Sequence, residues 1–176
     1  QYLGDTKMLQ RLDRAVEGAR IAQGMRTMRP DQVNAVVQGL RSQMGTDATP
    51  EQIARLKMME GVSTTMNTEL SKNQLGWAAK AGVIPAPKLI APETMTVDVL
   101  AERAILAKQS SANYGLPPQF FQPEEETRLK AVVEQGGKPL AVMLGMMSKG
   151  FGADMPLAVK QIAPKHPEVV QAGWLM

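Results

Sequence analysis

The placement of prolines constrains this fold more than any other sequence feature. Four prolines stand just ahead of short apolar-periodic segments near the end of the chain: Pro123, Pro139, Pro156 and Pro167. Proline suits the first position of a helix, because the N–H that it lacks would have no intrahelical partner there. The pattern therefore predicts a series of short helices in this region, each begun by a proline.

Longer helices are predicted in the N-terminal half. Apolar residues recur at three- and four-residue steps from Met8 to Met25, with charged residues around them, which is typical of an amphipathic helix. A second helix is predicted over residues 29–45. A third is predicted to begin at Thr49, which can form a capping box with Gln52.

This third helix has two possible lengths. Helical spacing continues from residue 62 to Trp77, so the helix can extend as far as Gly82. Gly61 lies in the middle of that stretch and is unfavourable inside a helix, so a break there is an equally good interpretation.

Signals for β-strands are nearly absent. No stretch alternates apolar and polar residues for long, and neither Asn-Gly nor Asp-Gly occurs as a hairpin turn. The predicted fold is therefore all-α, with about seven or eight helices. They are longer in the N-terminal half, and short and proline-initiated in the C-terminal half.

A proline-rich segment divides the predicted helices into two groups. The stretch "VIPAPKLIAPET" has three prolines in eight residues, each unfavourable inside a helix. The sequence predicts an N-terminal helical lobe (1–82), a proline-rich connector (83–95) and a C-terminal lobe of short helices (96–176). Thr96 is placed to cap the first helix of the second lobe, which is predicted to end at Tyr114.

Composition predicts a soft core and excludes several kinds of chemistry. Thirteen methionines and only 4% aromatic residues favour adaptable packing over sharply specified packing. Cysteine is absent, which excludes disulfides, thiolate nucleophiles and cysteine-based metal sites and leaves the redox compartment open. The apolar, charge-free run 139–148 is too short to span a bilayer as a helix. Because the first residue is Gln1, we expect a processed product or an excised fragment.

No residue pattern predicts a catalytic, cofactor or metal site. Glu124, Glu125 and Glu126 would point about 100° apart on a helix, so we expect an exposed, acidic first turn. His166 is the only histidine and lacks ligand partners at metal-site spacing, which predicts a solvated turn residue. The "GGK" at 136–138 lacks the earlier glycine and following hydroxyl residue of a phosphate-binding loop.

Glu69 is one candidate for a catalytic acid. Lytic transglycosylases have a catalytic Glu followed at once by Ser, and later a Gly-Leu-Met-Gln stretch. In this chain Leu70 separates Glu69 from Ser71, and "LGWAAK" stands in place of the second motif. The prediction is an ordinary carboxylate on a helix surface.

The N-terminal helix contains the candidate binding residues. Residues 1–29 hold six basic residues and three acidic ones, which accounts for the whole net charge of +3. Lys7, Arg11 and Arg14 share one helix face and are candidates for weak contact with nucleic acid phosphates. No aromatic platform accompanies them, so a solvated or subunit-pairing helix is the preferred interpretation.

Self-association through residues 5–29 is the resulting prediction. A helix with few large side chains buries little apolar area alone, so pairing with the same helix of another subunit would add burial. Small residues would allow the close approach, and charged neighbours including Glu17 and Arg20 would modulate it. The proposed contact residues are Arg11, Arg14, Ala15, Ala19 and Ala22.

Residues 97–173 carry a resemblance to a known class of protein. It consists of the Tyr-Gly-Leu-Pro-Pro turn (114–118), the Pro-Glu-Glu helix start (123–125), the Gly-Phe-Gly stop (150–152) and the later Pro-Glu. These stretches resemble helical, non-catalytic regions of internal virion (ejection) proteins of tailed bacteriophages. These features mark turns and the ends of helices, and none of them is a catalytic motif.

The resemblance implies a function, partners and a location. The expected function is that of a structural assembly module, without enzyme activity or cofactor, which helps form a conduit for genome delivery across the host envelope. The expected partners are further copies of the chain, other virion proteins, DNA in weak contact and the host envelope in peripheral contact. The chain would lie in the virion interior and, after ejection, in the envelope or periplasm. The alternative is a non-catalytic helical region of a cell-wall lytic transglycosylase or a similar hydrolase.

Overall fold

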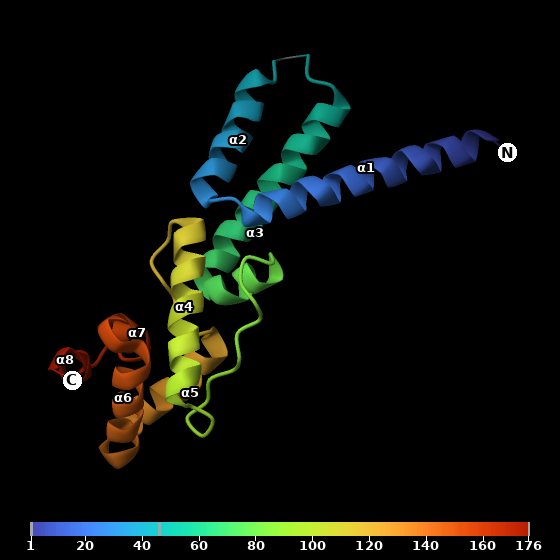
Figure 1. The fold of residues 1–176 in the computed structure, drawn as a ribbon. Coiled ribbons are helices and arrows are strands. Elements are labelled where there is room, and N and C mark those ends of the chain that lie inside the picture. The colour runs from blue at the N-terminus through green and yellow to red at the C-terminus, as the bar shows by residue number, and fades with distance from the viewer. Residues whose placement is uncertain (1, 46, 176) are drawn as a thin grey trace. The chain divides into compact units, whose positions relative to one another are not determined.

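A computed structural model describes the backbone of residues 2–45 and 47–175 and the side chains of residues 8, 9, 11–45 and 47–171. The described backbone contains helices and no strand, which confirms the all-α prediction (Figure 1). Helices are long in the N-terminal half and short later. In chain order they are α1 (Tyr2–Thr27), α2 (Pro30–Gln43), α3 (Pro50–Lys80), α4 (Val97–Tyr114), α5 (Pro123–Gln135), α6 (Gly137–Phe151), the 3-10 helix η1 (Gly152–Asp154), α7 (Met155–Ile162) and α8 (Pro167–Leu175).

The chain divides into two compact units, Gln1–Glu69 and Leu70–Met176. This division differs from the predicted one, in which residues 83–95 connected two lobes. The proline-rich segment lies inside the second unit, where Ile84, Ile90 and Met95 are buried. Prolines exclude a helix there, but they do not prevent an extended segment from packing into a core.

The first unit consists of α1, α2 and the longer part of α3. Its buried residues include Met25 of α1, Val33 and Val37 of α2, and Met59 of α3. The predicted capping box at the start of α3 is confirmed. The backbone N–H of Thr49 donates to Gln52 Oε1 at 2.8 Å, and the N–H of Gln52 donates to Thr49 Oγ1 at 3.3 Å.

The helix α3 continues through Gly61 and breaks at Asn73 instead. Asn73 has non-helical dihedral angles (φ −150°, ψ 74°), and its Oδ1 accepts a hydrogen bond from the N–H of Gly76 at 2.8 Å. Asn73 thus acts as a cap for the last turns of α3. Beside this break, the carbonyl oxygen of Ser71 accepts from Gln119 Nε2 at 3.2 Å, and Gln119 Oε1 accepts from the N–H of Gln74 at 2.9 Å.

The turn after α4 is anchored by aromatic side chains. Phe120 and Phe121 are buried and make edge-to-face contacts with Phe151, with ring centroids 5.2 and 5.7 Å apart. Gln161 of α7 fixes the backbone of the same turn. Its Oε1 accepts from the N–H groups of Phe120 and Phe121, and its Nε2 donates to the carbonyl of Pro118 at 3.0 Å.

A buried ion pair joins α4 to α5. Arg103 and Glu125 are 2% and 0% exposed, and two hydrogen bonds of 2.5 and 2.8 Å link their side chains. The prediction of an exposed acidic turn holds for Glu124 and is wrong for Glu125. The carboxylate of Glu125 turns inward because Arg103 neutralises it and backbone donors surround it.

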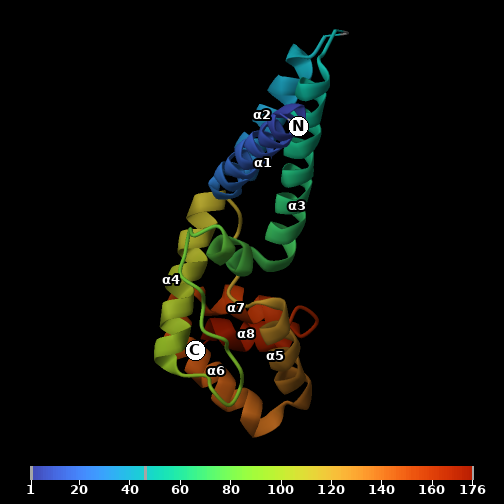
Figure 2. The same cartoon turned by 90° about the vertical axis from the view of Figure 1, so that its right-hand side faces the viewer.

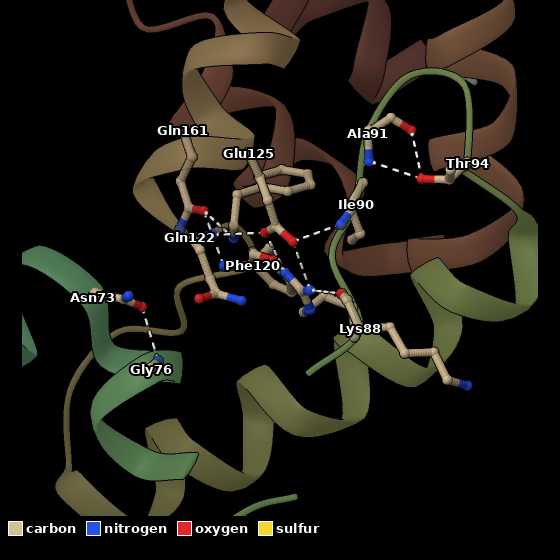
Figure 3. Close-up of polar contacts among 12 residues, drawn as sticks. Asn73, Gly76, Lys88, Ile90, Ala91, Thr94, Phe120, Gln122, Glu125 and Gln161 are labelled. Carbon is tan, nitrogen blue, oxygen red and sulfur yellow. Dashed lines mark hydrogen bonds and ion pairs between the residues drawn. The ribbon is translucent and has the colours of Figure 1, made fainter. Parts of the chain in front are cut away.

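Every remaining bond of this pair goes to the backbone. Glu125 accepts from the N–H of Ile90 at 2.7 Å and from the N–H of Gln122 at 2.8 Å (Figure 3). Arg103 donates to the carbonyl oxygens of Phe120 and Lys88. The pair therefore ties the proline-rich segment and the aromatic turn to two helices, which explains why residues 83–95 belong to the second unit.

Breaking this ion pair should strongly destabilise the second unit. Glu125→Gln leaves the Arg103 charge buried without a counterion, and we expect a loss of about 3–5 kcal/mol in the free energy of unfolding. Glu124→Gln, at the exposed neighbour, is the control and should cost less than about 1 kcal/mol. Both tryptophans, Trp77 and Trp174, belong to the second unit, so urea unfolding followed by tryptophan fluorescence measures it. Equal losses for the two variants would contradict the role given to the pair.

A close crossing of α4 and α6 depends on Gly150. A Cβ atom at this position would overlap the Cβ of Leu100 and lie 3.0 Å from the carbonyl oxygen of Val97. The two helices lie side by side in both views (Figures 1 and 2). Gly145 of the same helix has no such neighbour. Of these two glycines, therefore, only Gly150 is required for the close crossing of α4 and α6.

Adding one methyl group at these two glycines should have opposite effects. Gly150→Ala should lower the free energy of unfolding by about 1–3 kcal/mol, because the helices must separate. Gly145→Ala should raise it by up to about 1 kcal/mol, because alanine favours the helix and meets open space. The measurement is the same urea titration. Destabilisation by both substitutions would mean that the crossing is not what Gly150 provides.

Tyr114 makes the second unit sensitive to alkali. Burial raises the pKa of its phenol to about 12, against a smaller lowering by the hydrogen bond from Trp77. The folded state therefore holds the phenol proton more tightly than the unfolded state, and stability falls as the pH rises from 10 to 12. Over this range the wild type should lose about 2 kcal/mol more than Tyr114→Phe. Parallel stability curves for the two proteins in urea titrations would contradict this.

Candidate functional site

An exposed apolar face runs along the N-terminal half of α1. We call it the apolar stripe and define it as Met8, Leu9, Leu12, Ala15, Val16 and Ala19. Its large side chains are 73% exposed at Met8, 60% at Leu9, 58% at Leu12 and 46% at Val16. The three- and four-residue spacing places these residues on one side of the helix. Their apolar area stays in water in the single chain.

The backbone explains why the stripe is uncovered. Within the first unit, the N-terminal half of α1 extends away from α2 and α3 (Figure 1). Only the later part of the helix enters the core, where Met25 is buried. The sequence pattern from Met8 to Met25 looks like one continuous core-facing stripe, but Met8 and Leu12 lie outside the core.

A groove lies between α1 and α3 in the same unit. It has a volume of about 480 Å³. Gly18 of α1 lies against the flexible side chain of Met58 of α3, and a Cβ at Gly18 would lie 2.9 Å from Met58 Sδ. Its lining combines small or apolar residues (Gly18, Ile21, Pro50, Ala54 and Met58) with polar and charged ones (Arg14, Glu17, Glu51, Gln52 and Arg55).

The structure separates the predicted self-association residues into two sets. Ala15 and Ala19 are exposed on the stripe, Ala22 is half-buried, and Arg11 is exposed. Arg14 instead lines the groove, where its Nη2 lies 3.4 Å from Glu51 Oε1. The sequence analysis grouped Arg14 with the alanines as a charged residue that flanks the contact.

The structure describes the side chains of two of the three basic residues proposed to contact nucleic acid. Arg11 is exposed, and Arg14 is exposed beside Glu51. The side chain of Lys7 lies outside the described residues. Contact with phosphates through Lys7, Arg11 and Arg14 stays a prediction.

Other residues considered for chemistry have structural surroundings. His166 begins the turn into α8, and its Nδ1 lies 3.0 Å from Glu168 Oε1. The pKa of Glu168 is lowered by hydrogen bonding to its own backbone N–H and then by His166. Glu69 is half-buried on α3. Among the described residues, no three His, Asp or Glu side chains are grouped to hold a metal ion.

No described helix combines the length and the apolar character needed to cross a bilayer. The sequence matches no known family model, and neither the curated proteins nor the solved structures contain a significant match. The exposed surfaces of α1 are therefore the features from which a function can be inferred.

Proposed function

We propose that this chain is a non-catalytic assembly module that associates with further copies of itself through the apolar stripe of α1. The observation that best supports this proposal is the exposure of four large apolar side chains on one face of one helix: Met8, Leu9, Leu12 and Val16. Single exposed apolar residues are ordinary on protein surfaces, whereas a contiguous apolar face is typical of an interaction site.

Burying this apolar face against a partner would lower the free energy of the system. Burying apolar area contributes about 25 cal/mol per Å². The small residues Ala15 and Ala19 lie among the larger ones, so another helix can approach closely. The charges nearby are exposed and would contribute little to affinity in comparison.

The biological setting of the module is also a proposal. The resemblance of residues 97–173 to ejection proteins of tailed bacteriophages supports an internal virion protein that helps form a conduit across the host envelope. Its partners would be further copies of the chain and other virion proteins, and it would act in the virion and then in the envelope. The methionine-rich core fits this role, because flexible side chains tolerate loss and recovery of packing.

The proposal predicts association that depends on concentration and on the stripe. Sedimentation velocity of the full chain should show species larger than a monomer as the concentration rises. Leu12→Glu combined with Val16→Glu should weaken association by about 100-fold or more, because charges replace two buried aliphatic side chains. Both positions are exposed in the single chain, so the fold should be retained.

The control is Val36→Glu, which places the same charge at an exposed apolar residue of α2, 41% exposed and outside the stripe. It should associate like the wild type. A wild type that stays monomeric at all accessible concentrations would remove the physical support for the assembly proposal. Equal weakening by the control would show that the stripe is not the contact.

A further inference from the structure

The apolar stripe and the groove lie on nearly opposite faces of α1. At 100° per residue, the mean direction of the six stripe residues differs by roughly 170° from that of the groove residues Arg14, Glu17, Gly18 and Ile21. Two surfaces of the same helix are therefore open at once. A single contact between two stripes would cover only one of them.

We propose that the stripe of one copy occupies the groove of the next copy, so that the chain assembles head to tail. This inference rests on the proposed function and adds the partner surface. The groove presents apolar atoms of Ile21, Ala54 and Met58 between two helices. The stripe combines the aliphatic side chain of Val16 with Ala15 and Ala19, so an apolar side chain can enter the groove where the alanines let the backbones approach closely.

Both surfaces carry exposed charges that can pair across the contact. The groove lining carries Glu17 and Arg55, and also Glu51, which pairs with Arg14 within the same copy. The stripe is flanked by exposed residues of both signs: Arg11, Asp13 and Arg20. An incoming helix can therefore place an arginine near Glu17 and its aspartate near Arg55. Such rim charges fix orientation more than they add affinity.

This geometry determines the kind of assembly. A two-fold dimer joined stripe to stripe would leave both grooves empty. Head-to-tail contacts leave one free stripe and one free groove at the ends of every open chain. Growth therefore continues until a ring closes or a filament forms.

Mixing two defective variants distinguishes the alternatives. Leu12→Glu with Val16→Glu destroys the stripe and leaves the groove intact. Ala54→Glu places a charge in the groove at an exposed position of α3 and leaves the stripe intact. We expect each full-length variant alone to be monomeric. Mixed in equal amounts, they should form a heterodimer of twice the monomer mass and nothing larger, measured by light scattering after size-exclusion chromatography.

Each other outcome overturns the head-to-tail arrangement. If Ala54→Glu alone associates like the wild type, the groove is not used; the assembly proposal then survives with stripe-to-stripe contacts. If both variants are monomeric and their mixture stays monomeric, the two surfaces do not meet. Circular dichroism with wild-type helix content for both variants ensures that misfolding does not account for either result.

Discussion

The buried contact between Arg103 and Glu125 determines how the second unit can be built. Removing both charges from water is costly, and that cost is offset only when every polar atom finds a partner. Here the partners are backbone groups of Lys88, Ile90, Phe120 and Gln122. The pair therefore positions two loops that have no regular structure of their own. Helices α4 and α5 supply the two charged side chains, and the loops supply the backbone N–H and carbonyl groups that bond to them.

The two units differ in which side chains they bury and which they leave exposed to water. The second unit buries aromatic rings and an ion pair, and its half-buried glutamine side chains bond to the backbone. The first unit has three long helices and leaves a large apolar face of α1 in water. The proposed head-to-tail assembly requires a stable body and exposed contact surfaces, and the distribution of burial along the chain fits that combination.

Much of the fold follows from local sequence signals. The prolines, Thr49 and Thr96 predicted helix starts because capping depends on neighbours a few residues apart. Features that depend on residues far apart in the sequence were not predicted. Glu125 has the same local pattern as exposed Glu124, and only Arg103 distinguishes them. The break in α3 occurs at Asn73 rather than Gly61, since the capping bond to Gly76 compensates for the lost helix geometry. The spacing indicated the alanines of the stripe but not Leu9 or Val16, whose exposure depends on which part of α1 enters the core. The groove could not be predicted because it requires α3 beside α1.

The glutamines around the aromatic turn have a consequence for how this protein can evolve. Gln161 and Gln119 bond to main-chain atoms of Pro118, Phe120, Phe121 and Gln74, and a main-chain bond does not depend on the neighbouring side chain. A residue held in this way can change its side chain without losing the bond, provided that it keeps its N–H. Related sequences should therefore retain the glutamines and exclude proline at positions 120 and 121. Their exposed loop residues can diverge until little overall similarity remains.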